Sequence, residues 1–242
     1  MTNNNEFRVR GFKILPLVIK NLLIINGLLY LATYALRNTV DLNDILGLHF
    51  ISAQKFHFYQ LVTYMFMHGN ISHIFFNMFA LWMFGSALEN FWGAKRFLIY
   101  YFITGIGAGI MQEITWAIEL REVLQSHIEV INLSGELLSK TDFFNQLITV
   151  GASGAVYGLL LAFGMMFPNS LIYVYFLFPM KAKWFVILYG VLELFNGIVG
   201  SNSGIAHFAH LGGMIFGFFL ILYWRNQAKR KIKRMQQQYY FR

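Results

Sequence analysis

Residues 151–167 read GASGAVYGLLLAFGMMF, and residues 209–217 read AHLGGMIFG. Apolar and small residues dominate both stretches, and Ser153 and His210 stand near their starts. Polar and ionisable side chains are costly within a membrane, so at that depth they are functional candidates by default. A serine and a histidine together can form a nucleophile and its base. The two stretches therefore predict membrane helices and nucleophilic chemistry inside the membrane.

The composition extends this prediction to the whole chain. The 242 residues are 57% hydrophobic and only 12% charged, whereas soluble domains contain about 25% charged residues. A bilayer core of about 30 Å requires roughly 20 apolar residues per helical span. Alternating segments of about ten residues, which are typical of membrane barrels, are absent from the sequence. We therefore expect an all-α, multi-pass integral membrane protein.

Charge and cysteine content exclude several other classes. The sequence contains no cysteine, which rules out disulfides and thiolate chemistry. The net charge of +8 lies largely in one run from Arg225 to Arg234, directly after the last apolar stretch. We interpret this run as a cytoplasmic anchor for lipid headgroups and expect membrane lipids, but no nucleic acid, as partners.

Apolar runs near 20 residues long predict six spans. They cover residues 17–36, 71–88, 97–116, 148–167, 171–199 and 204–224. Pro179 falls inside the fifth run, so its membrane part is expected to start near Trp184. We expect one domain over residues 1–242, with a retained cytoplasmic tail at about 1–16 and a basic tail at about 225–242. The long external segment 112–147 has the pattern of an amphipathic surface helix.

The distribution of basic residues predicts the orientation of the spans. With the N-terminus inside, the external loops keep only Arg37, Lys55, Arg121 and Lys140. This asymmetry follows the positive-inside rule, so both termini are expected in the cytoplasm, most simply at a bacterial inner membrane. The second, fourth and sixth spans then begin in the outer leaflet, and the polar residues near their starts are expected at one depth.

Two further polar residues occur early in the second span. Asn77 follows His73 by four residues, which places both on one helical face. Two such donors suit an oxyanion hole, although they could instead bond to neighbouring helices. Tyr157 follows Ser153 by one turn and could stack under an imidazole or simply pack in the core.

Small residues around the serine and the histidine allow close helix contact. Ala209, Gly213 and Gly217 form a stripe beside His210, and Gly154 and Gly158 form another beside Ser153. On its own, Ser153 could be only a packing residue. His207 and His210 could ligate a metal, but the sequence lacks an HExxH motif and we expect no membrane carboxylate to complete a site. We therefore predict neither metal nor cofactor.

Taken together in order and spacing, these motifs resemble those of the rhomboid intramembrane serine proteases. The resemblance runs from Leu61 to Gly217 and includes Phe66-Met67-His68-Gly69, His73-Ile74-Phe75-Phe76-Asn77-Met78, Gly85-Ser86-Ala87-Leu88-Glu89 with Gly93, Gly151-Ala152-Ser153-Gly154 with Tyr157, and Ala209-His210-Leu211-Gly212-Gly213. The chain departs from the family pattern at Tyr59-Gln60, where Trp-Arg is frequent, and in the length of the loop before the fourth span.

The resemblance implies a six-helix bundle of rhomboid type and a role for each site residue. Ser153 would be the nucleophile and His210 the general base, in a dyad without an aspartate. His73, Asn77 and the Ser153 N–H would form the oxyanion hole, and Tyr157 would support His210. Glu89 would be structural, tying the inner end of the second span to its loop.

The function expected from these residues is intramembrane serine endopeptidase activity, with the transmembrane segments of other proteins cleaved near the outer leaflet. A catalytically silent rhomboid-like protein that binds membrane clients in quality control is the main alternative. Such silent proteins lack the serine or the histidine, and both residues are present here. A small transporter is a further alternative, but its polar residues would be expected at the membrane midplane.

Overall fold

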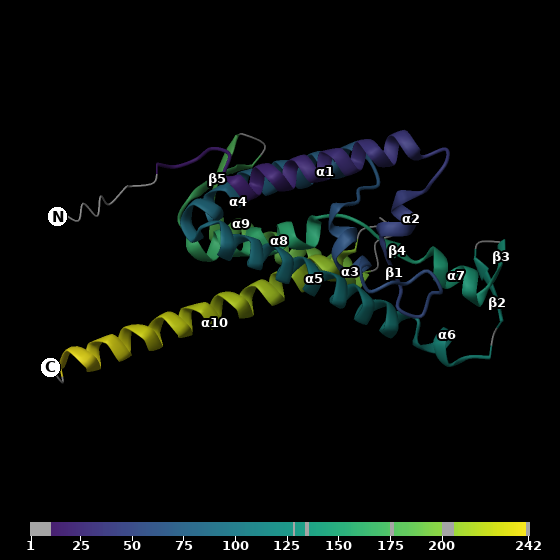
Figure 1. Ribbon diagram of the computed structural model, residues 1–242. Coiled ribbons are helices and arrows are strands. Elements are labelled where there is room, and N and C mark those ends of the chain that lie inside the picture. Colours follow the sequence, from purple (N-terminus) through teal and green to yellow (C-terminus); the bar gives the residue numbers. More distant parts are fainter. Residues whose placement is uncertain (1–10, 128, 134–135, 175–176, 200–205, 241–242) are drawn as a thin grey trace.

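Long apolar runs form helices here because a helix satisfies its backbone hydrogen bonds internally, as a membrane requires. The computed structural model describes residues 11–127, 129–133, 136–174, 177–199 and 206–240 and contains a bundle of helices (Figure 1). The six main helices are α1 (Leu17–Leu36), α4 (Ile71–Trp92), α5 (Ala94–Glu119), α8 (Ser153–Met166), α9 (Ala182–Val199) and α10 (His207–Tyr240). The protein is thus an all-α membrane bundle, as predicted.

Short elements connect these helices at both ends of the bundle. They are α2 (Leu42–Leu46), α3 (Gln60–Thr63), the 3₁₀ turn η1 (Tyr64–Phe66), α6 (Arg121–Gln125) and α7 (Lys140–Gln146). Three antiparallel strand pairs accompany them: β1 (Leu48–His49) with β4 (Ile148–Thr149), β2 (Val130–Leu133) with β3 (Glu136–Ser139), and β5 (Leu171–Val174) with β6 (Phe178–Lys181).

Each of the six predicted spans contains a helix, but their bounds differ from the prediction. Within the described residues, five helices are long and apolar enough to cross a membrane. The exception is α8, whose 14 residues measure about 21 Å. The fourth predicted span starts too early because residues 148–149 pair with β1 as a strand. Helix α8 therefore begins at Ser153 itself.

One other sequence expectation is wrong. Segment 112–147 is not one amphipathic helix: α5 continues to Glu119, and α6, the β2–β3 hairpin and α7 follow. The rings of Phe50, Trp116 and Phe144 form a small aromatic cluster that joins α7 and the end of α5 to the residues after β1. The first part of the predicted fifth span forms the strand pair β5–β6, and α9 begins at Ala182, close to Trp184, where the membrane part of this span was expected to start.

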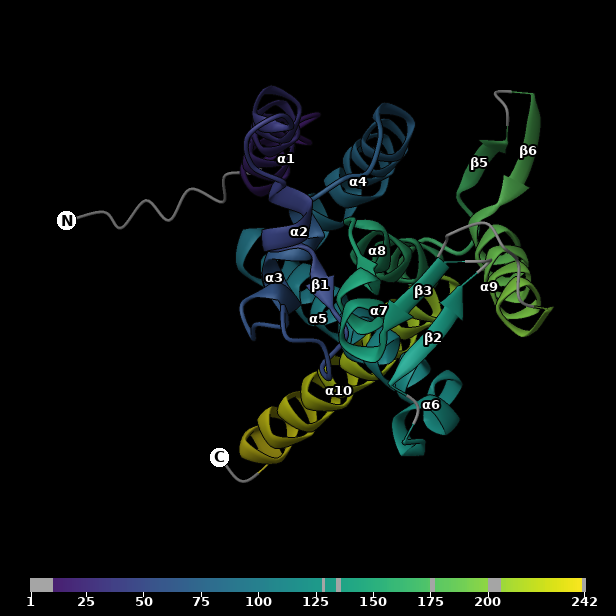
Figure 2. The ribbon, with the colours of Figure 1, turned by 90° about the vertical axis from the view of Figure 1, so that its right-hand side faces the viewer.

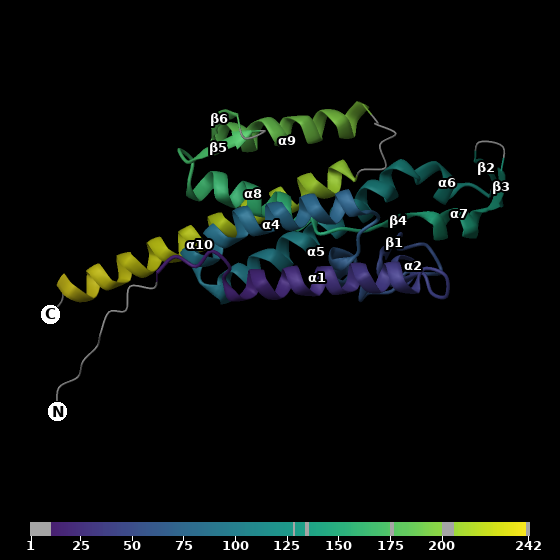
Figure 3. The ribbon, with the colours of Figure 1, turned by 90° about the horizontal axis from the view of Figure 1, so that it is seen from above.

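The helices form layers, with α1 and α9 on opposite edges of the bundle (Figure 3). Helix α8 lies in the interior, where it contacts α4, α5, α9 and α10 (Figure 2). Small residues permit this. A methyl group on Gly213 of α10 would overlap the carbonyl oxygen of Gly154, and one on Gly154 would overlap the side chain of Ala108. Helices α8 and α10 therefore meet backbone to backbone.

The first connecting segment is organised around Gln60, one of the two residues that depart from the family pattern. Its side chain is fully buried. Its carbonyl oxygen accepts from the His49 and His57 N–H groups at 3.3 and 3.1 Å, and its amide donates to the Ile45 and Lys55 carbonyls at 3.2 and 2.9 Å. A neutral amide thus supplies both donors and acceptors to hold this loop.

Glu89 has a structural role, but its partner differs from the prediction. Its carboxylate accepts from the Val18 and Ile19 N–H groups at 3.1 and 2.9 Å. Because the first N–H groups of a helix lack intrahelical acceptors, the carboxylate caps α1. Glu89 therefore ties α4 to the first span, rather than to the loop that follows α4.

Candidate active site

Ser153 and His210 are in direct contact. Ser153 is the first residue of α8, and His210 lies in the first turn of α10. The His210 Nε2 atom is 2.8 Å from the Ser153 hydroxyl oxygen. His210 is buried and Ser153 partly so. This geometry allows the imidazole to accept the hydroxyl proton.

The ring of Tyr157 fixes the plane of the His210 imidazole. The two rings are stacked, with centroids 4.2 Å apart and an interplanar angle of 9°. Tyr157 reaches this position because it follows Ser153 by one helical turn. Its hydroxyl donates to the carboxylate of Glu193 in α9.

Glu193 brings a carboxylate to the far side of His210. The Glu193 Oε2 atom lies 3.1 Å from Nδ1 of His210 and 2.7 Å from Nδ1 of His207. Glu193, His207 and His210 are all buried. The expectation that no membrane carboxylate would approach these histidines is therefore wrong. A carboxylate inside an apolar run is itself a signal of function, and that signal, present at position 193, could have indicated this residue.

The same three residues satisfy the distance requirement for a metal site. Their ligand atoms lie within 4.8 Å of one another. In the structure, however, Glu193 already accepts from the Tyr157 hydroxyl and lies at hydrogen-bonding distance from His207. Both carboxylate oxygens thus have partners within the protein.

His73 and Asn77 line one cavity with Ser153 and His210. The cavity has a volume of about 590 Å³ and is also bordered by residues 148–151. Asn77 is buried, and its amide donates to the His73 carbonyl at 2.9 Å. The amide nitrogen carries a second hydrogen, for which no acceptor is found among the described residues. The four polar residues predicted from three separate spans are thus brought together.

Gly151 shapes the wall of this cavity next to the serine. Its φ of 128° lies in a region that favours glycine. A side chain there would also meet Nε2 of His73 at 2.6 Å and approach the Ser153 hydroxyl to 3.6 Å. The Gly151 N–H donates to the Tyr64 carbonyl at 2.8 Å, and the Tyr64 hydroxyl donates to the Gly105 carbonyl at 2.6 Å. The turn before Ser153 is therefore fixed to α5 through η1.

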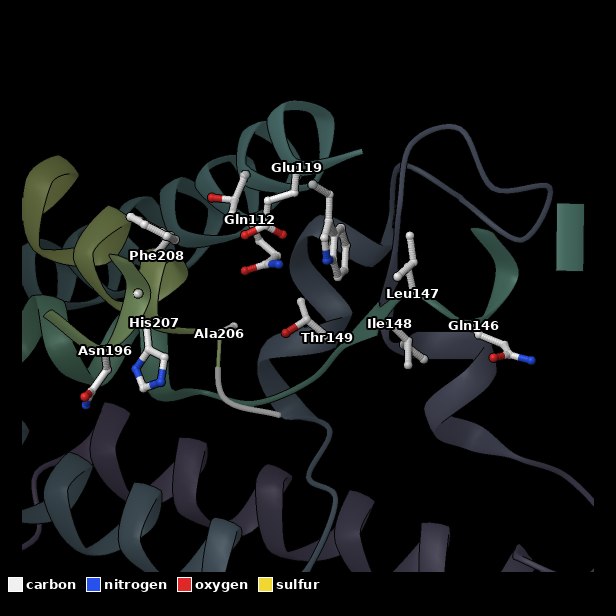
Figure 4. Close-up of a pocket in the computed structure, with 13 residues that line it drawn as sticks. Gln112, Glu119, Gln146, Leu147, Ile148, Thr149, Asn196, Ala206, His207 and Phe208 are labelled. Atoms are coloured by element: carbon white, nitrogen blue, oxygen red, sulfur yellow. The ribbon is translucent and has the colours of Figure 1, made fainter. Parts of the chain in front are cut away.

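A second, more polar pocket lies beside His207 (Figure 4). Its volume is about 330 Å³, and its lining includes Gln112 and Glu119 of α5 and Asn196 of α9. Residues 148–149 and Ala206 line both cavities. His207 thus both contacts Glu193 and lines this polar pocket.

His68 is a buried histidine near the site that the sequence did not single out as functional. Its ring centroid is 5.1 Å from that of His73. Burial, and secondly the proximity of His73, lower the pKa of His68 to about 4. His68 is therefore neutral at physiological pH.

Fold and site together define an integral membrane protein in which a serine and a histidine meet inside a helical bundle. Residues 55–227 match the Rhomboid domain family. The chain belongs to the rhomboid family, which is a family of intramembrane proteases.

Several known proteins are similar to the chain. It is 29% identical over 163 residues to the RHOMBOID-like protein 6, mitochondrial, of Arabidopsis thaliana, covering 67% of this chain and 42% of that protein. It is 29% identical over 167 residues to the Rhomboid protease GluP of Bacillus subtilis, covering 66% and 25%. It is 27% identical over 173 residues to the Rhomboid protein 1, mitochondrial, of Saccharomyces cerevisiae, covering 69% and 43%. The matches thus span less than half the length of these relatives.

Proposed function

We propose that the chain is a serine endopeptidase that cleaves transmembrane segments of other membrane proteins, with Ser153 as nucleophile and His210 as general base. The observation that carries this proposal is the 2.8 Å contact between the two side chains inside the bundle. Such a contact can activate a hydroxyl that is otherwise a weak nucleophile. Membership in a family of intramembrane proteases adds support.

In the proposed reaction, the Ser153 oxygen attacks a substrate carbonyl while His210 Nε2 takes the hydroxyl proton. His210 then gives this proton to the leaving amine, and water, activated by the same histidine, releases the acyl group. The negative charge on the carbonyl oxygen would be stabilised by His73, by Asn77 and by the N–H of Ser153. That N–H is available because it belongs to the first turn of α8, where backbone donors have no intrahelical acceptor.

Substrate choice would follow from the position of Ser153 in a membrane helix bundle. Carbonyl groups of an intact transmembrane helix are already hydrogen-bonded, so a substrate must unwind before it reacts. Glycine or proline eases unwinding by about 1 to 3 kcal/mol relative to alanine. We propose cleavage of single-span proteins near the outer leaflet, with both termini of the enzyme in the cytoplasm of a bacterial cell. The chain would act as one domain over residues 1–242.

The test is cleavage of a model transmembrane substrate by the purified protein in liposomes. We expect Ser153→Ala and His210→Ala each to abolish cleavage while leaving the protein folded, and the double variant to be no worse, because the two groups act as a unit. A fluorophosphonate should label Ser153, as located by mass spectrometry, and a chelator should have no effect. Residual cleavage by Ser153→Ala above background would contradict the serine mechanism.

A further inference from the structure

Glu193 is a buried charge at the meeting point of three helices. It comes from α9, while Tyr157 comes from α8 and His207 and His210 come from α10. Unpaired carboxylates are rarely buried in an apolar bundle, because desolvation disfavours the charged form. Here three side chains surround the group: the Tyr157 hydroxyl on Oε1, and the two histidines on Oε2.

The two holding contacts fix where the carboxylate sits. The Tyr157 hydroxyl donates to one oxygen, and His207 Nδ1 lies 2.7 Å from the other. His207 has its ring at 88° to that of His210, so the two rings approach the carboxylate from different directions. Glu193 is thus anchored by residues other than His210.

Each of the two ring nitrogens of His210 faces a different partner, and one of these partners is the anchored Glu193 carboxylate. Nε2 faces the Ser153 hydroxyl at 2.8 Å, and Nδ1 faces Glu193 Oε2 at 3.1 Å. The Nδ1 contact has the distance of an ion pair without the alignment of a hydrogen bond. The carboxylate therefore acts on His210 chiefly through its charge, which favours a proton on Nδ1 and leaves Nε2 free to accept.

We propose that Glu193 is a positioning residue for the reaction, which makes the functional unit Ser153–His210–Glu193 instead of a dyad. This inference rests on the proposed protease function. When Ser153 attacks, the proton moves from its oxygen to His210 Nε2, and the imidazole becomes a cation. The neighbouring carboxylate stabilises that cation without taking the proton itself. Helix α9, which lies at the edge of the bundle, thereby contributes to chemistry on α8 and α10.

Tyr157 makes two separate contacts in this arrangement. Its ring stacks on His210, and its hydroxyl holds the carboxylate that faces the same imidazole. A phenylalanine at this position would keep the stacking and lose the hydroxyl. Tyr157→Phe therefore separates the two contacts, and it loosens the carboxylate without removing its charge.

The main test compares Glu193→Gln with Glu89→Gln. Both replace a buried carboxylate by an amide of the same shape, but Glu89 caps α1 and touches no site residue. We expect Glu193→Gln to lower kcat about 10²-fold, less than the roughly 10⁴-fold loss known for a hydrogen-bonded triad carboxylate, because the contact here lacks hydrogen-bond alignment. KM should change less than about twofold, and the loss of rate should be smaller than that in Ser153→Ala. Glu89→Gln should leave both constants unchanged. Fluorophosphonate labelling of Ser153 should slow in parallel with kcat, and Glu193→Asp should recover part of the loss.

Each other outcome has a defined meaning. Unchanged kcat in Glu193→Gln overturns the proposal while Ser153→Ala still verifies the protease, so the two failures are distinguishable. A rise in KM alone assigns Glu193 to substrate binding. A loss of rate that is accompanied by a lowered unfolding midpoint assigns Glu193 to a structural role and overturns the proposal. Activity lost to a chelator and restored by Zn²⁺ makes the carboxylate a metal ligand and overturns the proposal.

If Glu193→Gln does not fold, Tyr157→Phe should still lower kcat at constant KM, and an unchanged kcat there overturns the proposal. A wild-type protein that neither cleaves nor labels overturns both proposals.

Discussion

Two buried glutamates stand at opposite ends of the bundle and are used differently. Glu89 and Glu193 have 5% and 7% of their surface exposed. Among the described residues, Glu89 accepts only from backbone N–H groups of α1, whereas Glu193 contacts a tyrosine hydroxyl and two imidazoles. Backbone donors do not titrate, but imidazoles do. Burial alone therefore does not identify a functional carboxylate; the chemistry of its partners does.

The two ends also differ in how closely their helices approach. At the end that holds Ser153, which we call the serine end, Gly213 meets the backbone of Gly154. At the Glu89 end, Gly85 faces the tip of the Ile19 side chain, 2.5 Å from where a methyl group would sit. A side-chain tip can turn away, but a helix backbone cannot. The serine end is thus the less tolerant of the two.

The largest effect expected at the serine end, apart from loss of the serine or the histidine, concerns the two residues that we propose as donors to the oxyanion. His73→Ala or Asn77→Ala should each lower kcat about 10²- to 10³-fold, because removing one such donor costs about 2.7 to 4 kcal/mol of transition-state stabilisation. The measurement is Michaelis kinetics on a transmembrane substrate. A raised KM at unchanged kcat would assign these residues to substrate binding.

His68 should make the serine end sensitive to acid. Its pKa is lowered to about 4 from an ordinary value near 6.5, so the unfolded chain binds the proton more readily than the folded one. Stability is then lost as the pH falls from about 6.5 to about 4, by up to about 3 kcal/mol. His68→Gln should reduce this loss in unfolding curves measured across that range. The same substitution at exposed His127 is the control and should leave the loss unchanged; an identical loss in both variants would contradict the assignment.

The packing difference between the ends can be measured with one methyl group. Gly213→Ala should destabilise the protein by about 2 to 3 kcal/mol, the upper part of the range for overpacking, and should lower cleavage as well, because α10 must move away from α8. Gly85→Ala should cost less than about 1 kcal/mol, since Ile19 can adopt another rotamer. Unfolding and cleavage assays on both variants test this, and equal losses would mean that the two contacts are equally rigid.

The smallest effect is expected at the Glu89 end. Glu89→Gln removes the charge but keeps one acceptor oxygen for α1, so we expect a loss of about 1 to 2 kcal/mol in the free energy of unfolding. Glu89→Ala removes both acceptors and should cost more. Thermal unfolding of the two variants measures the difference, and equal stability of all three proteins would show that α1 needs no cap.

Much of the fold could be predicted from the sequence. Hydropathy located all six helical regions, because the membrane requires long apolar runs wherever the chain crosses it. The small-residue stripes at Gly154 and Gly213 indicated close packing for a similar reason, since only such residues let backbones meet. What hydropathy could not locate was the start of α8. That start depends on a pairing between residues 48–49 and 148–149, which are distant in the chain.

For the site, order and spacing in the sequence singled out Ser153, His210, His73, Asn77 and Tyr157. Helix periodicity shows which residues share one helical face, and the alternating direction of the spans shows which residues share one depth in the membrane. Only the tertiary structure brought Glu193 to His210 and Glu89 to α1. Neither contact has a local signature: each joins side chains or backbone from different helices, and their distance is decided by how those helices pack. A sequence names the groups that are costly to bury, whereas the packing of the helices decides which partner compensates each one.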